Sequence, residues 1–212
     1  MTNVLPPARM ASVATLTRYA AHGIDGAQWY RHGTAQIEFV AHANGWEADH
    51  LAGIMAATSP RCSVVRNIRM ALHYCHHGDI RVIPMRGVRS AVNHFEKTGR
   101  LRGPKTSAFF ANLRGNCEPV TLDVWMAYAL KVEQSAFSRV ATRERAAQRV
   151  AAAGRALGLR PCESQAAIWT GFRRFAGYND SPFSVVSEFL TARANNWKIE
   201  GCSIHTHEGG SE

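Results

Sequence analysis

The chain has 212 residues, 46% of them hydrophobic and 19% charged, which is enough to bury a core without disulfides or bound metal. Its formal net charge of +9 and pI near 9.8 favour a polyanionic partner over a small acidic ligand. No apolar run approaches the roughly 20 residues of a membrane span, and the first ten residues lack a signal-peptide core. We therefore expect a cytoplasmic protein with no membrane partner.

The cysteines give no sign of a structural framework. They are scattered, odd in number and without metal-ligand spacing, which predicts reduced thiols in an intracellular setting. The five positions are Cys62, Cys75, Cys117, Cys162 and Cys202.

Helical spacing of apolar residues and helix-stop residues predict helices along most of the chain, whereas strand patterns are nearly absent. After an extended leader over 1–7, the expected helices cover 8–21, 27–43, 51–57, 62–76 and 88–97, two that start near 104 and 123, then 136–157, 161–175 and 181–194. We therefore expect an all-α fold, with one helical domain over 1–200 and a polar, disordered tail over 201–212.

The expected helix over 62–76 carries two noteworthy groups. Arg66 and Arg69 share a face that suits phosphate contacts, although a solvated helix surface explains them equally well. His73 and His77 have metal-capable spacing, but no further ligand accompanies them, so we expect no metal.

The segment from 99 to 130 carries the chemistry. Gly103 permits a tight turn, Pro104 suits a first helical turn, and Thr106 or Ser107 is positioned to satisfy free backbone amides there. An amide-rich turn flanked by Arg100 and Arg102 is typical of a phosphate site, so we assign all of these residues except Pro104 to DNA binding. Lys105 opens the helix.

Asp123 begins the next apolar helix, where the helix dipole favours its ionised form. Each residue also has a simpler interpretation. Lys105 is then a solvated first-turn lysine, and Asp123 is an ordinary N-terminal cap that stabilises its helix by about 1 kcal/mol.

At these residues the chain resembles the helix-hairpin-helix (HhH-GPD) DNA glycosylase superfamily, which includes endonuclease III. The segment 105–108 (KTSA) matches the family's helix start after its hairpin, and 122–125 (LDVW) matches the segment that holds the catalytic aspartate. The resemblance implies that Lys105 is the Schiff-base lysine of bifunctional members and that Asp123 is the catalytic carboxylate. Two departures stand out: Leu101 lies near the place of a hairpin glycine, and Trp125 replaces the usual histidine.

The match continues upstream and covers about residues 46–135. Residues 51–61 and 64–67 resemble the family's apolar helix, base-wedging loop and next helix, which makes Ser59 a substrate contact and Arg61 the candidate wedge. The resemblance implies a two-lobed helical fold with a cleft between the lobes. The four-cysteine cluster of some family members is missing, so we expect no iron–sulfur cluster and no other cofactor.

The expected helix over 161–175 places Gln165 and Trp169 four residues apart, on one side, where they suit hydrogen bonding and stacking with a flat ring. Core packing of Trp169 beside a polar neighbour is the simpler interpretation. The Gln-Ala-x-x-Trp pattern is also similar to phage relatives of the glycosylase fold.

These residues predict an enzyme that acts on DNA, mainly double-stranded and including DNA with modified bases, after a base has left the stack. One chemistry is cleavage of the N-glycosidic bond. An alternative implied by the phage relatives is thymine hypermodification, in which an amine or amino acid replaces pyrophosphate on 5-hydroxymethyluracil in DNA. A third possibility, from a different class, is a helical DNA-binding protein without catalysis.

Overall fold

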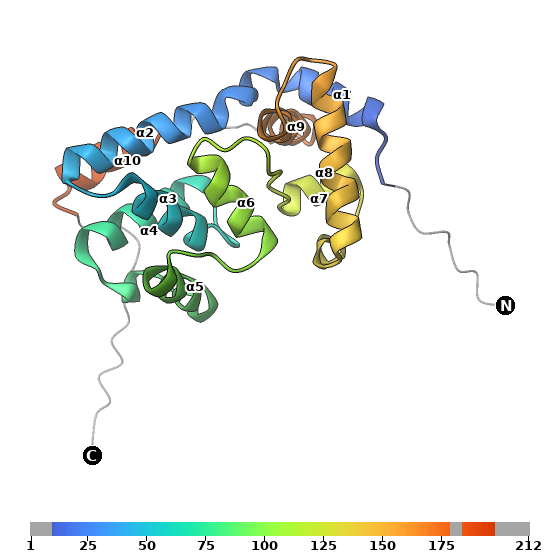
Figure 1. Cartoon of the computed structure of the whole chain (residues 1–212). Helices are drawn as coiled ribbons and strands as arrows, with labels where there is room; N and C mark the ends of the chain where they lie inside the picture. The colour runs from blue at the N-terminus through green and yellow to red at the C-terminus, as the bar shows by residue number, and fades with distance from the viewer. Residues whose placement is uncertain (1–9, 179–183, 198–212) are drawn as a thin grey trace.

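The structure, a computed structural model, describes residues 10–178 and 184–197. Within these ranges every regular element is helical, which confirms the all-α prediction (Figure 1). The predicted leader over 1–7 and the predicted tail over 201–212 lie outside the described residues. The α-helices are α1 (Val13–His22), α2 (Trp29–Asn44), α3 (Ala48–Thr58), α4 (Val64–His77), α5 (Arg86–Thr98), α6 (Pro104–Leu113), α7 (Val124–Leu130), α8 (Val140–Arg155), α9 (Pro161–Phe175) and α10 (Val185–Ala194). Short 3-10 helices are η1 (Ile24–Gln28), η2 (Ile80–Val82) and η3 (Gln134–Ser138).

Two helices depart from their predicted starts, each for a local reason. α1 begins five residues later than expected, because the Ser12 hydroxyl accepts a hydrogen bond from the Thr15 N–H at 3.1 Å and fixes the start at Val13. The expected helix over 136–157 is divided, because η3 takes its first turn and extended backbone at Arg139 separates η3 from α8.

The buried apolar side chains form two clusters. Core 1 is built mainly from α2, α3, α4, α5 and α10, with Leu113 at the end of α6. Core 2 is built mainly from α1, α7 and α8. Helix α9, seen end-on in Figure 1, contributes Cys162 and Ala166 to core 1 and Ala167 and Ile168 to core 2, so it joins the two.

This division places the two candidate catalytic residues on different clusters. Lys105 lies in the first turn of α6, whose end packs in core 1, whereas Asp123 directly precedes α7, which packs in core 2. Their separation in space therefore depends on how the two clusters meet, and local sequence does not determine that. None of the helices in the described residues has both the length and the apolar character needed to cross a membrane.

Candidate active site

The turn before α6 is built around Gly103, which has φ 94° and ψ 143°. This backbone conformation is nearly restricted to glycine. The Thr106 hydroxyl donates to the Arg102 carbonyl at 2.7 Å, and the Ser107 hydroxyl donates to the Leu101 carbonyl at 3.1 Å. The prediction that these hydroxyls satisfy free amides is therefore wrong: they hold the loop through its carbonyl groups, and no side chain caps α6.

The α6 N-terminus is thus a helix end without a capping side chain, at the surface of the molecule. Gly103 is exposed, and so are the side chains of Arg100 and Arg102 in the preceding loop. Uncapped first-turn amides, the positive end of a helix dipole and two arginines together suit an anion such as a phosphate. The geometry is compatible with the predicted role of this turn.

Lys105 points from this turn toward the loop between α3 and α4. Its Nζ donates to the Ser59 hydroxyl at 2.7 Å and to the Ser59 carbonyl at 3.3 Å. The side chain is half-buried. Burial is the main cause that lowers the pKa of Lys105 below its ordinary value, and the negative charge of Asp123 opposes this shift. Lys105 is therefore not the solvated surface lysine of the simpler interpretation.

Asp123 caps α7 and is also held by α9. One carboxylate oxygen accepts a hydrogen bond from the Met126 N–H at 2.9 Å, and the other accepts from the Trp169 indole N–H at 3.1 Å. Burial raises the pKa of Asp123, while the Met126 N–H, the Lys105 charge and the Trp169 N–H oppose that rise. The capping interpretation is thus correct, but a side chain from a distant helix fixes the carboxylate as well.

The structure brings the Lys105 and Asp123 side chains into one region of the molecule. Both are half-buried, and the charge of each acts on the pKa of the other. A pocket of about 450 Å³ adjoins Lys105, whereas Asp123 does not line it. Its walls come from the α3–α4 loop, from the turn before α6 and the start of α6, from the segment before Asp123 and from the η3–α8 region. They comprise Pro60, Arg102, Gly103, Pro104, Lys105, Thr106, Val120, Leu122, Gln134, Phe137, Ser138, Arg143, Glu144 and Ala147.

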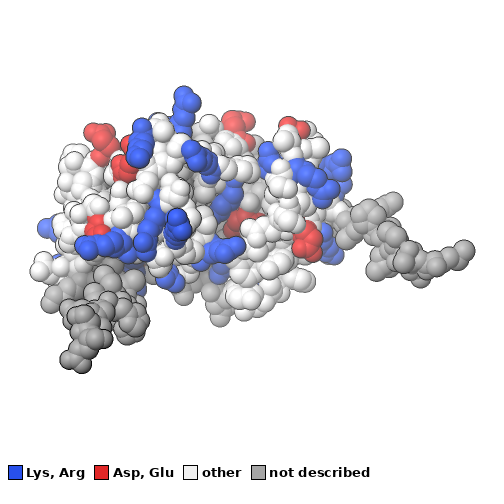
Figure 2. Space-filling view, turned by 90° about the horizontal axis from the view of Figure 1, so that it is seen from below, with Lys and Arg blue, Asp and Glu red and all other residues white. Residues whose placement is uncertain are grey.

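Two predicted DNA contacts lie on the neighbouring loop and helix. Arg61 is exposed and adopts φ 56°, a left-handed conformation that is uncommon outside glycine. Arg66 is exposed in the first turn of α4. Figure 2 shows many Lys and Arg side chains over the middle of the face seen from below Figure 1. Arg69, in contrast, pairs with Glu188 at 2.6 Å.

Gln165 and Trp169 do not form the shared face that their spacing predicts. Gln165 is only 4% exposed, and its side-chain carbonyl oxygen accepts a hydrogen bond from the Tyr30 hydroxyl at 2.7 Å. Trp169 is half-buried and bonds to Asp123. Gln165 is therefore placed to order the interior beside the site, and its contact with substrate stays a prediction.

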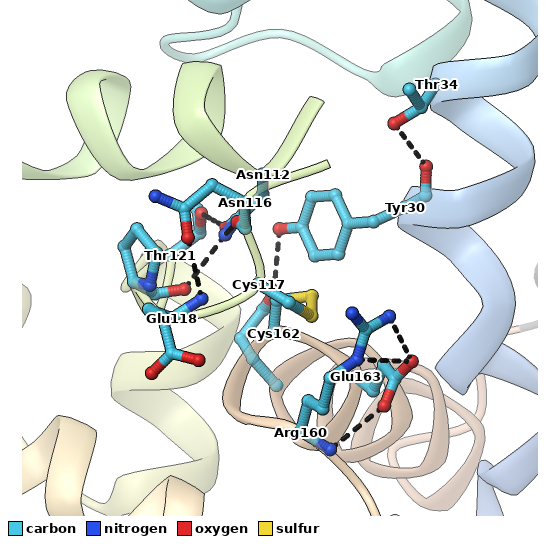
Figure 3. Close-up of a disulfide and its surroundings, with 12 residues drawn as sticks. Tyr30, Thr34, Asn112, Asn116, Cys117, Glu118, Thr121, Arg160, Cys162 and Glu163 are labelled. Atoms are coloured by element: carbon cyan, nitrogen blue, oxygen red, sulfur yellow. Dashed lines mark hydrogen bonds and ion pairs between the residues drawn. A yellow bond between two sulfur atoms is a disulfide. The ribbon is translucent and has the colours of Figure 1, made fainter. Parts of the chain in front are cut away.

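A disulfide connects the segment before Asp123 to α9 (Figure 3). Cys117 and Cys162 are paired with their Cα atoms 4.8 Å apart, and the Cys162 N–H donates to the Cys117 carbonyl at 3.0 Å. The prediction of reduced thiols is therefore wrong for this pair. Long-range packing brought the two cysteines together, and neither number nor spacing in the sequence indicates the pairing. Cys62 and Cys75 are free thiols.

The sequence interpretation missed an aromatic group next to Asp123. The Arg173 guanidinium lies 4.4 Å from the Trp169 ring and 4.9 Å from the Trp125 ring. Tyr128 and Tyr178 contact Trp125 edge-on, with ring centroids 5.8 and 4.8 Å from it. The spacing of Trp125 and Tyr128, and of Trp169 and Arg173, is helical, so this signal was available in the sequence.

No metal centre emerges at the histidines of α4. The rings of His73 and His77 lie 4.4 Å apart, and the His73 Nε2 contacts the Trp197 carbonyl at 3.0 Å. Within residues 10–178 and 184–197, no group of three or more potential ligands is placed to hold a metal ion.

The conformation of Gly103 makes Gly103→Ala a test of the turn before α6. A side chain at φ 94° strains the backbone, although an added Cβ has room, with the Thr106 hydroxyl 3.7 Å away. We expect a loss of about 1–3 kcal/mol in the free energy of unfolding, measured by urea denaturation. Gly87→Ala is the matched control, because Gly87 has open space and no positive φ. An equal effect of both substitutions would show that the Gly103 conformation is not required.

A family model described as a family of unknown function (DUF7178) matches residues 14–176. The match includes the turn before α6, Lys105, Asp123 and all of α9. No curated protein and no solved structure matches the chain.

Proposed function

We propose that this chain, which belongs to the DUF7178 family of unknown function, is a DNA-acting enzyme that works on a base rotated out of the stack. The proposal includes a two-lobed HhH-GPD-like arrangement, in which core 1 and core 2 are the lobes. The observation that carries it is the proximity of Lys105 and Asp123. Lys105 opens a helix that ends in core 1 and Asp123 precedes a helix of core 2, with 17 positions between them, yet the charge of each acts on the pKa of the other. Lys105 also lines a pocket of about 450 Å³, which is large enough for a nucleobase.

The surface around the pocket supports DNA as the partner. The uncapped start of α6 and the exposed Arg100 and Arg102 suit the phosphates that flank the target nucleotide. Arg61 is the candidate wedge, because it is exposed at the tip of the α3–α4 loop in a left-handed conformation. Such strain in a non-glycine residue costs about 1–3 kcal/mol and is often kept for a functional reason.

The two residues divide the chemistry of a glycosylase between them. Burial lowers the pKa of Lys105, which increases the share of neutral amine that is able to attack the sugar C1′. The base leaves with the electron pair of the N-glycosidic bond and takes a proton, and loss of the amine proton leaves a Schiff base after ring opening. Asp123 stabilises positive charge that develops on the sugar.

The same pair serves the alternative reaction on 5-hydroxymethyluracil whose hydroxyl group already carries pyrophosphate. There an amine or amino acid attacks the exocyclic carbon, pyrophosphate leaves with the electron pair of the carbon–oxygen bond, and the attacking nitrogen gives up a proton to a general base. The Lys105 amine, when protonated, is suited to stabilise the negative charge of the leaving pyrophosphate. The Asp123 carboxylate is suited to accept the proton of the nucleophile. Of the two chemistries we propose glycosidic cleavage first. Burial lowers the pKa of Lys105, and cleavage through a Schiff base is the reaction that needs a neutral amine.

Borohydride trapping tests the proposal. The protein is incubated with duplexes that each contain one modified pyrimidine or purine, with sodium borohydride, and the products are separated by mass. We expect a covalent protein–DNA adduct with the natural chain and none with Lys105→Met, while both proteins bind the duplex equally well.

The remaining outcomes identify the alternatives. A mass change on the base without an adduct, dependent on added amine, supports group transfer instead. Retained binding with no reaction on any substrate supports the DNA-binding protein without catalysis. DNA affinity that does not change between 50 and 200 mM salt contradicts every DNA role, because phosphate contacts make binding salt-dependent, by about 10³-fold or more over this range for several contacts.

A further inference from the structure

Two rings of the aromatic group next to Asp123 are exposed to solvent. We call Trp125, Tyr128, Arg173 and Tyr178 the aromatic platform. The side chains of Tyr128 and Tyr178 are 57% and 51% exposed. Helix α7 already packs in core 2 through Met126, Ala127, Ala129 and Leu130. Packing of the helix therefore does not account for Trp125 and Tyr128 on α7, or for Tyr178, which lies after the end of α9.

The platform is continuous with the candidate active site. The Arg173 guanidinium lies over both Trp125 and Trp169, and the Trp169 indole donates to the Asp123 carboxylate at 3.1 Å. Arg173 and Trp169 thus lie between the Tyr178 ring and the carboxylate, and Trp125 lies between Tyr128 and Arg173. This continuity distinguishes the platform from other exposed rings such as Phe39 on α2.

The chemistry of the platform indicates its ligand. Aromatic rings with a guanidinium among them bind flat, electron-rich rings that carry a nearby negative charge. A nucleobase attached to its phosphate has this combination, and the net charge of +9 on the chain attracts the rest of a strand. A proline-rich peptide would also pack on such rings, but the net charge of +9 on the chain favours a polyanionic partner over it.

We infer that the aromatic platform stacks an unpaired base of a DNA strand next to the target nucleotide. The inference rests on the proposed function in that it takes DNA as the partner. It adds that the protein prefers a strand whose bases are unpaired, because paired bases have both faces covered by their neighbours in the duplex. The platform is a binding surface and takes no part in bond breaking.

Binding to strands with and without bases tests this inference. Fluorescence anisotropy would be measured with labelled 12-nucleotide strands of thymidine and of abasic tetrahydrofuran units, which have the same phosphates. We expect the natural chain to bind the thymidine strand more tightly. Tyr128→Ala should weaken that binding about 5- to 100-fold, the range for loss of one base–aromatic stack, and leave abasic binding unchanged. Tyr128→Phe should bind like the natural chain.

Phe39→Ala is the matched control, since Phe39 is 59% exposed, close to the 57% of Tyr128, and lies on another helix. Equal affinity of the natural chain for the two strands overturns the inference, and so does an equal loss in the Phe39 and Tyr128 variants. These results are independent of turnover. Base-dependent binding without any reaction keeps the platform and removes the enzyme, whereas an adduct trapped through Lys105 without base-dependent binding does the reverse.

Discussion

Asp123→Asn should lower the rate of the DNA reaction about 100-fold or more while leaving DNA affinity within about twofold. Asparagine keeps the shape of the side chain and caps a helix as well as aspartate does, so α7 should still begin at Val124. The variant loses the negative charge that lies near Lys105 and that would stabilise the positive charge developing on the substrate. Single-turnover rates on a duplex that contains one modified base measure the effect.

Stability measurements separate this loss of rate from a loss of fold. Burial is the largest cause of the raised pKa of Asp123, so the fold disfavours the ionised carboxylate. The destabilisation is complete above the folded pKa and disappears below the unfolded pKa. Asparagine removes this cost at neutral pH, but it has a single acceptor oxygen, whereas the carboxylate accepts from both the Met126 and the Trp169 N–H. The two effects oppose each other, so the melting temperature of the variant should stay within about 5 °C of that of the natural chain. A larger fall would indicate that Asp123 serves the fold.

Asp79→Asn is the matched control. Asp79 is also an N-terminal cap, since its carboxylate accepts a hydrogen bond from the Arg81 N–H at 2.9 Å at the start of η2. It lies in the segment after α4, away from the pocket residues. We expect unchanged rates in this variant. A comparable loss of rate in both variants would remove the catalytic role of Asp123.

Local chemistry accounts for the parts of the site that the sequence predicts well. Gly103 and Pro104 specify the start of α6, and Asp123 specifies the start of α7, because caps and turns depend on a few neighbouring residues. The bond from Lys105 to Ser59 joins segments 46 residues apart, and the bond from Trp169 to Asp123 spans the same interval. The first contact lies beside core 1 and the second beside core 2. Both depend on tertiary packing between distant segments, which periodicity within a helix does not reveal.

Two errors have the same origin. Helical spacing places Gln165 and Trp169 on one side of α9, but α9 lies between two cores, so Gln165 meets Tyr30 while Trp169 meets Asp123. Cysteine number and spacing indicate reduced thiols, but the fold brings Cys117 against Cys162. The disulfide also removes one reason for expecting a reducing compartment, because disulfides are rare there.

Reduction of the Cys117–Cys162 disulfide should lower the free energy of unfolding by about 4 kcal/mol, the chain-entropy value for a cross-link whose ends are 45 residues apart. The measurement is guanidinium denaturation with and without reductant, on the natural chain and on Cys117→Ser. The variant should unfold at the same denaturant concentration in both conditions. Cys62→Ser is the control, because Cys62 is a free thiol and this variant should keep the full response to reductant.

The disulfide also holds the parts that position Asp123. Cys117 begins the segment that leads to Asp123, and Cys162 lies one turn before Gln165 and two turns before Trp169 on α9. Its loss should therefore lower the reaction rate under conditions in which the protein stays folded. The buried hydrogen-bond network of Asn112 opposes this effect. Thr121 donates to the Asn112 side-chain carbonyl at 2.7 Å, and the Asn112 side-chain amide donates to the Pro119 carbonyl at 2.9 Å, so the same segment is held without the disulfide. An unchanged rate in folded Cys117→Ser would assign the positioning of Asp123 to that network, and the disulfide to stability alone.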